Sequence, residues 1–279
     1  MNLDKAGQDF RKENLPSNRK ELFFDCIKQR FGLIMLLAFV LFLFALPLLL
    51  VSFSKDAYLV SIGLAFDKKE ITQANYDQMY FMAINLGSLI SIPCFLLFSV
   101  GLAGALRVIR QLVWQEGIFF KEDFFDGIKL NFKHYLIYGF IFGVCYYISN
   151  ISTLIPLQNI EILKALPFII TFVIILPIIL FAIVQSQIYS LTIKQEMKNG
   201  FFFLIKTFFT TFIATAFVAI PLTFDLIPIF FLKMLAVIIY VLFILPFIIL
   251  GVFLYINSQL DKYLNKEHFP DIYRKGLVD

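Results

Sequence analysis

The chain has 279 residues, of which 60% are hydrophobic and only 16% charged, and its mean hydropathy is +0.83. Soluble globular domains are nearer half apolar and a quarter charged, so this composition excludes a water-soluble fold. With 13 glycines, 10 prolines and three cysteines, collagen-like, disordered and disulfide-scaffold chains are excluded as well. We therefore expect an all-α polytopic membrane protein.

Six long apolar runs are predicted to cross the bilayer as helices. A crossing needs ~20 apolar residues to cover ~30 Å of hydrocarbon. The run at 204–224 is the weakest, because Lys206 stands near its start and threonines dilute it, but threonine hydroxyls can bond back to the helix backbone. The polar stretch at 52–79 is expected to be an outer loop, long enough for a small surface helix. The predicted spans are 31–51, 80–106, 135–155, 166–190, 204–224 and 230–256.

Basic residues are divided unequally between the two sides of this arrangement. Nineteen of the 24 lysines and arginines fall on the side of the termini and five on the other. The positive-inside rule then places both termini in the cytoplasm. The net charge of +4 needs no nucleic-acid partner, since anionic lipid attracts that face. We expect one membrane domain over 1–279, with a cytoplasmic segment at 1–30, a cytoplasmic amphipathic loop at 107–134 and a cytoplasmic tail at 257–279.

A nine-residue pattern, Phe-Phe-x-x-Ile-Lys-x-x-Phe, occurs at 23–31, 124–132 and 201–209. Each copy precedes a helix expected to run outward, which favours an internal repeat of three helical hairpins in parallel orientation. A weaker echo is Ile-Leu-Pro, at 175–177 and again at 244–246. The 36 phenylalanines make chance matches common, so the alternative is phenylalanine bias with ordinary interface chemistry.

The loop at 107–134 contains an amphipathic segment whose aromatic residues recur every four positions. This pattern is typical of a helix lying in the membrane surface, with its rings in the acyl boundary and its lysines toward lipid phosphates. Such a helix either docks a cytoplasmic partner, as the coupling helices of transport permeases do, or only braces the second and third spans. The candidate docking residues are Phe120, Phe124, Phe125, Ile128, Lys129, Phe132 and Lys133.

Small and polar residues within the spans indicate helix packing and a candidate path for a solute. The packing residues are Gly101, Gly104, Gly139 and Gly143, since small side chains let helices approach closely. Four amides either line a polar path or bond helix to helix: Asn85, Asn150, Gln185 and Gln187. No ionisable side chain is expected in the middle third of the membrane, although Lys233 near the outer end can pair with Asp225.

The residue types that catalysis needs are scarce. Only two histidines occur, and no zinc-protease, phosphate-loop or serine-hydrolase motif is present. We therefore expect no catalytic, cofactor or metal site, and no enzymatic activity.

Several segments resemble the YesL family of small bacterial polytopic membrane proteins. The likeness lies in LFFDCIKQRF at 22–31, GLAGALRVIR at 101–110, FFDGIKLNFK at 124–133 and the tail segments at 261–265 and 269–277. The family is largely uncharacterised and is often encoded beside carbohydrate-uptake genes. The resemblance implies a bacterial plasma-membrane protein with an accessory role in sugar import or envelope physiology, and it carries over no catalytic residues.

These features together predict a non-enzymatic integral membrane protein that is an accessory or regulatory component of a transport system. Its expected partners are the lipid bilayer and membrane or ATPase subunits of that system. The alternative is a permease-like subunit that itself moves a small solute or lipid, and assembly into a homo-oligomer is also open.

Overall fold

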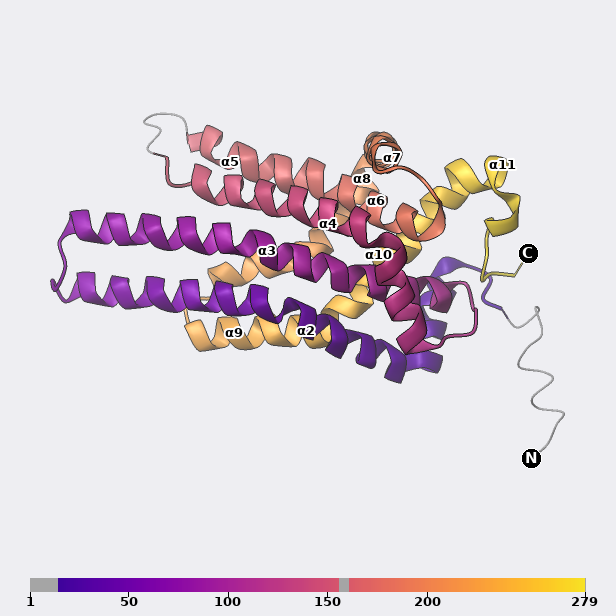
Figure 1. Cartoon of the computed structure of the whole chain (residues 1–279), viewed down its shortest axis with the longest axis horizontal. Coiled ribbons are helices and arrows are strands. Elements are labelled where there is room, and N and C mark those ends of the chain that lie inside the picture. Colours follow the sequence, from indigo (N-terminus) through magenta and orange to yellow (C-terminus); the bar gives the residue numbers. More distant parts are fainter. Residues whose placement is uncertain (1–14, 156–160, 279) are drawn as a thin grey trace.

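The computed structural model describes residues 15–155 and 161–278, and within these ranges the chain forms helices and short connections without strands (Figure 1). In this part of the chain, five continuous helical stretches are long and apolar enough to cross a membrane: α2, α3, α4, Leu163–Ile188 and Phe230–His268. A bent pair, α7 with α8, gives up to six. The predicted all-α membrane architecture is therefore confirmed at this level. The main helices are α2 (Arg19–Asp67), α3 (Gln73–Val113), α4 (Phe120–Ser152), α5 (Glu161–Ile169), α6 (Leu176–Ile188), α7 (Ile193–Lys206), α8 (Phe208–Val218), α9 (Phe230–Ile239) and α10 (Leu245–Leu260).

Helices α2 and α3 form an antiparallel hairpin that extends beyond the other helices (Figure 1). The expected loop at 52–79 is wrong: α2 continues to Asp67 and α3 begins at Gln73. At 1.5 Å per residue the 49 residues of α2 rise about 70 Å, well over the ~30 Å of a hydrocarbon core. The turn is fixed by Lys69, whose φ is 61°, and by Thr72, whose side chain accepts a hydrogen bond from the Asn75 amide.

The segment predicted as a sixth span, 204–224, is not one straight helix. Helices α7 and α8 meet at 110°, and α8 has only 11 residues before a 3₁₀ turn, η3 (Ile220–Leu226). Thr207, at the break, has φ −127° and ψ 30°, and its hydroxyl donates to the Phe203 carbonyl at 2.7 Å. A threonine hydroxyl bonded back to the preceding turn competes with helical geometry, which is consistent with a bend at this residue.

The three copies of the nine-residue pattern have different local structures. Arg30 in the first copy has φ −127° and ψ 27°, close to the angles of Thr207 in the third copy. The second copy lies within the unbroken α4, whose first turns run oblique to the long axis of the bundle (Figure 1). In both Ile-Leu-Pro sequences the isoleucine is the last residue of a π-helical stretch. These stretches are η2 (Ile170–Ile175) and η4 (Tyr240–Ile244). The internal repeat stays a prediction.

Both ends of the described chain lie at one end of the bundle, which we call the terminus end; the tip of the α2–α3 hairpin marks the hairpin end (Figure 1). The Val278 amide donates to the Pro16 carbonyl at 3.0 Å, and Arg19 pairs with Asp261 at 2.6 Å. Lys275 pairs with Glu116 at 2.5 Å and lies over the ring of Trp114. These contacts fasten the tail to the start of α2 and to the loop after α3.

Candidate functional site: a central cavity

A cavity of about 350 Å³ lies between the helices of the bundle. Its wall is contributed by α2, α3, α4, α6, α8, α9 and α10 together with the π-helical stretches η2 and η4 and the 3₁₀ turn η3, so segments from all along the chain close it. Most of the lining is apolar and aromatic, as in small-molecule sites generally. The polar members of its lining are Ser52, Lys55, Ser88, Ser91, Ser99, Tyr135, Tyr138, Tyr146, Asp225, Lys233 and Tyr240.

Many hydroxyls of the wall already donate to the protein. Ser91 donates to the Gly87 carbonyl at 2.8 Å and Ser99 to the Leu96 carbonyl at 2.7 Å. Tyr135 donates to the Ile183 carbonyl at 2.7 Å. Because these donors are engaged, the wall offers few hydrogen-bond donors for a buried polar ligand, and unmatched polar groups are costly to bury.

Four charged side chains meet at the hairpin end of the cavity. Lys233 Nζ lies 2.6 Å from Asp56 Oδ2 and 2.5 Å from Asp225 Oδ1, and Lys55 Nζ lies 3.8 Å from Asp56 Oδ1. The predicted pairing of Lys233 with Asp225 is therefore confirmed. Lys233 and Asp56 are 16% and 12% exposed, whereas Asp225 is 69% exposed. This ionic cluster joins α2, η3 and α9 at the mouth of a mostly apolar chamber.

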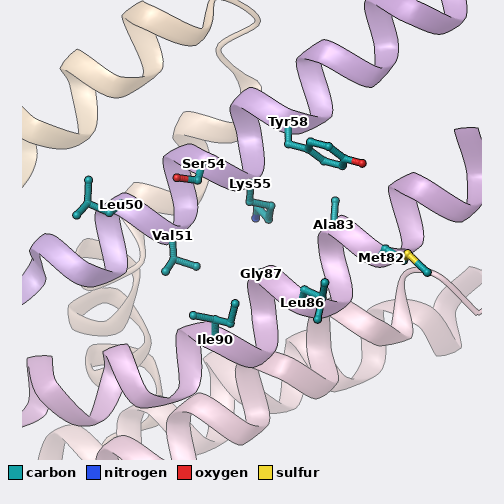
Figure 2. Close-up of a pocket in the computed structure, with 10 residues that line it drawn as sticks. All are labelled: Leu50, Val51, Ser54, Lys55, Tyr58, Met82, Ala83, Leu86, Gly87 and Ile90. Carbon is teal, nitrogen blue, oxygen red and sulfur yellow. The ribbon is translucent and has the colours of Figure 1, made fainter.

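A second hollow, a groove of about 460 Å³, lies between α2 and α3 on the outside of the hairpin (Figure 2). Exposed apolar residues such as Leu50, Leu86 and Ile90 line it. Figure 2 shows Lys55 reaching from α2 into the gap between the two helices. A Cβ atom at Gly87 would lie 3.0 Å from Lys55 Cδ, so this glycine makes room for the lysine.

The groove and the cavity share three lining residues, Val51, Lys55 and Gly87. The stem of Lys55 therefore stands at the boundary between the exposed face of the hairpin and the central chamber. We regard the central cavity, rather than the groove, as the candidate site, because Lys233, Asp225 and several buried hydroxyls line the cavity and not the groove.

The terminus end of the cavity is formed by Tyr135 and Tyr138 of α4. Behind them lies Glu196 of α7, which is fully buried. The Tyr138 hydroxyl donates to Glu196 Oε2, and His134 Nδ1 lies 2.9 Å from the same oxygen. The cavity is thus linked at this end to a buried carboxylate.

The four amides proposed to line a polar path are not in the lining of the cavity. Gln187 donates to the Tyr135 hydroxyl at 2.8 Å, and Gln185 accepts from Asn199 at 3.1 Å. Asn85 accepts from Tyr147 at 2.9 Å, and Asn150 donates to a carbonyl of its own helix at 2.8 Å. Their observed contacts are hydrogen bonds within and between helices. This matches the alternative in which the four amides hold helices together and do not line a path.

The amphipathic segment before the third span is helical, but it is the first part of α4 rather than a separate helix on the membrane surface. Phe124 is only 4% exposed and lies against Gly104 and Phe44, so its expected place in the acyl boundary is wrong. Phe125 and Phe132 are exposed, as are Lys129 and Lys133. Phe120 and Ile128 are partly buried.

The structure places the four packing glycines at close helix contacts. Added Cβ atoms would lie 2.5 Å from Phe44 at Gly101 and 2.7 Å from Phe124 at Gly104. At Gly139 the nearest atom would be Ser99 Oγ, at 2.5 Å, and at Gly143 it would be Ile92 Cα, at 3.2 Å.

Sequence reasoning missed Glu196, because the residue stands among the lysines of a polar segment between two spans. Its burial depends on α7 folding back against α6, which no local pattern reveals. A signal was present in Gly200, one turn further along the same helix face, whose Cβ would lie 2.7 Å from the Ile178 carbonyl. Asp56 was missed because the hairpin was read as a loop there.

No group of three or more potential metal ligands occurs in residues 15–155 and 161–278. Comparison of the chain with known protein families, curated proteins and solved structures finds no match. The chemistry of the central cavity is therefore the basis for any functional proposal.

Proposed function

We propose that the chain is a non-enzymatic integral membrane protein that binds a single-chain amphiphile of the lipid class in its central cavity and moves it as a permease-like subunit. The cavity carries this proposal. Its apolar wall suits an acyl chain, and the ionic cluster at its mouth suits a polar headgroup. Such a ligand buries its chain and leaves its charges among Lys55, Lys233 and Asp225.

The engaged hydroxyls of the wall favour an amphiphile over a sugar. A buried sugar would have to find a partner for each hydroxyl, whereas Ser91, Ser99 and Tyr135 already donate to carbonyl groups. The groove beside Lys55 supports the same class of ligand, because exposed apolar side chains of the α2–α3 hairpin lead to the boundary of the cavity. A lipid would reach the chamber from the bilayer by displacing the Lys55 stem.

The excess of basic residues at the terminus end supports an orientation with both termini in the cytoplasm. The ionic cluster then faces the outer leaflet. With the resemblance to the YesL family, the basic excess also supports a bacterial plasma-membrane location and a link between the amphiphile and envelope physiology.

A second candidate function is that of an accessory component that docks a membrane or ATPase subunit of a transport system. It is motivated by the exposed side chains along one face of early α4, where Phe125 is 51% and Phe132 47% exposed, with Lys129 and Lys133 beside them. Replacing Phe125 and Lys129 should abolish co-purification of such a subunit in mild detergent while the protein stays in the membrane. Failure to recover any stoichiometric partner counts against this candidate.

The amphiphile proposal is tested by crosslinking with a photoactivatable fatty acid, with a photoactivatable hexose as the comparison. We expect the fatty acid to label peptides that carry cavity residues, such as Phe142 and Leu180. The Ser91→Trp variant, which fills the cavity, should lose this labelling. The Ser61→Trp variant, which adds the same side chain on the exposed surface of α2, should keep it.

Two results would count against the proposal. Labelling by the hexose alone would assign the cavity to a sugar. Labelling by the fatty acid that is confined to exposed residues, and equal in the two tryptophan variants, would leave the cavity without a ligand.

A further inference from the structure

A buried acid stands between the central cavity and the surface at the terminus end. Glu196 is fully buried, because α7 packs closely on α6 where Gly200 meets the Ile178 carbonyl. An isolated carboxylate is costly to bury, so its charge must be compensated by a partner or by a proton. Glu196 is therefore the group of the site whose protonation state depends most on its partners.

Two hydrogen bonds connect this acid to opposite sides. Tyr138, which lines the cavity, donates its hydroxyl proton to Glu196 Oε2. His134 Nδ1 lies 2.9 Å from the same oxygen, and the His134 side chain is 24% exposed. The series of groups thus runs from the cavity wall through a buried carboxylate to a partly exposed imidazole.

Among the described residues, His134 and Tyr138 are the titratable groups that act on Glu196. From α4 the titratable groups that face it are His134, Tyr135 and Tyr138. From α6 only neutral side chains approach, with Gln185 donating to the Glu196 carbonyl at 3.5 Å and Gln187 to the Tyr135 hydroxyl at 2.8 Å. The three lysines of α7, Lys194, Lys198 and Lys206, are exposed.

The second carboxylate oxygen adds an independent observation. Glu196 Oε1 is buried and has no hydrogen-bond partner within the described part of the chain. Buried polar atoms are nearly always paired, and an exception calls for a functional explanation. An oxygen in this state is ready to take up a proton.

We propose that His134, Glu196 and Tyr138 form a proton relay that connects the terminus-end surface to the central cavity. A proton from water binds His134 Nε2 while the Nδ1 proton passes to Glu196. The ring is left neutral and the carboxylate becomes a neutral carboxyl group, so that one proton has been taken up in total. Loss of the carboxylate charge weakens the acceptor of the Tyr138 hydroxyl and frees that hydroxyl to turn toward the cavity.

The relay deepens the proposed function, since it makes occupancy of the lipid cavity sensitive to pH at the terminus end. With both termini in the cytoplasm, acidification there changes the polarity of the cavity floor. The direct test nevertheless needs no lipid, because it follows the protons themselves.

The chain has two histidines, and the His268→Asn change leaves His134 as the only one. Ring-labelled histidine in this background therefore gives one set of magnetic resonance signals, which can be followed as pH is lowered in detergent. In the wild type we expect the ring to change from its Nδ1–H to its Nε2–H tautomer as Glu196 takes up the proton. Glu196→Gln should lose this change, because a side-chain amide cannot take up the Nδ1 proton. Tyr138→Phe should keep the change of tautomer but move the pH at which it occurs, because the carboxylate loses a hydrogen-bond donor.

Tyr146→Phe is the matched control, being the same change on the cavity wall two turns further along α4. It should leave the titration unaltered. An unchanged titration in both Glu196→Gln and Tyr138→Phe would overturn the relay, and should Glu196→Gln fail to fold, Tyr138→Phe alone decides. In a second arm, photoactivatable fatty acid labelling should vary with pH in the wild type and lose that variation in Tyr138→Phe.

The two proposals fail separately in these arms. Histidine titration that depends on Glu196 without any lipid labelling removes the proposed function and keeps the relay. Lipid labelling that is independent of pH, with an unchanged titration, removes the relay and keeps the function.

Discussion

The ionic cluster at the mouth of the cavity leads to a quantitative prediction for Lys233→Met. Lys233 and Asp56 are 16% and 12% exposed and lie 2.6 Å apart. Removing one partner of a buried ion pair costs roughly 3–5 kcal/mol, because the other charge stays buried without compensation. Lys55 remains 3.8 Å from Asp56 and offsets part of that loss. We therefore expect Lys233→Met to lower the free energy of unfolding by about 3 kcal/mol.

Asp225→Asn provides the contrast. The Asp225 side chain is 69% exposed, although its distance to Lys233 Nζ, 2.5 Å, is as short. Exposed ion pairs contribute no more than about 1 kcal/mol, since water screens them. Asp225→Asn should therefore cost under about 1 kcal/mol, and the double variant Lys233→Met with Asp56→Asn should recover much of the loss seen in Lys233→Met alone.

Equilibrium unfolding in mixed micelles, with added sodium dodecyl sulfate as the denaturant, measures these differences. Salt supplies a further check, because it should weaken the contribution of Asp225 more than that of Asp56. Equal effects of Lys233→Met and Asp225→Asn, or no recovery in the double variant, would refute the assignment of Asp56 as the buried partner.

Three further predictions concern packing. Gly139→Ala should destabilise the fold by about 1–3 kcal/mol through overpacking. Gly63→Ala, with nothing within 4 Å of its added Cβ, should instead stabilise α2 by up to about 1 kcal/mol. The same unfolding assay compares the two variants, and equal effects would contradict the close contact at Gly139. Phe124→Ala should lower the free energy of unfolding by about 3–5 kcal/mol and Phe125→Ala by under about 0.5 kcal/mol. Equal, small effects of the two variants would indicate that both rings lie on the surface. Gly276→Ala places a Cβ 2.1 Å from the Val113 carbonyl oxygen at a φ of 85°, so the tail should detach and become sensitive to limited proteolysis, while an intact tail would argue against this contact.

The helical class and most of the membrane-crossing segments could be predicted from the sequence because they depend on the length of apolar runs. The extent of the α2–α3 hairpin could not be predicted in this way. Hydropathy predicts which residues lie in the hydrocarbon core, but it does not predict where the helix ends. Helix α2 ends only near Lys69, whose φ is positive. The stretch from Ser52 to Asp67 contains no proline to break α2.

The polar parts of the site depended on tertiary structure. Phe124 and Phe125 are neighbours in the same aromatic pattern, and only the presence of Gly104 on the facing helix selects Phe124 for burial. Glu196 lies in a lysine-containing segment that reads as solvent-exposed, and it becomes a buried acid only because α7 packs on α6. In contrast, the pairing of Lys233 with Asp225 was predictable, since the two residues are close in sequence and flank one turn.

The central claim is that the cavity holds one amphiphile. Native mass spectrometry of the detergent-purified protein tests it most directly, by counting the lipid-class molecules retained by the wild type, Ser91→Trp and Ser61→Trp. The account predicts one retained molecule per chain in the wild type and in Ser61→Trp, and none in Ser91→Trp. Equal retention in all three proteins, or none in the wild type after addition of fatty acid, would contradict it.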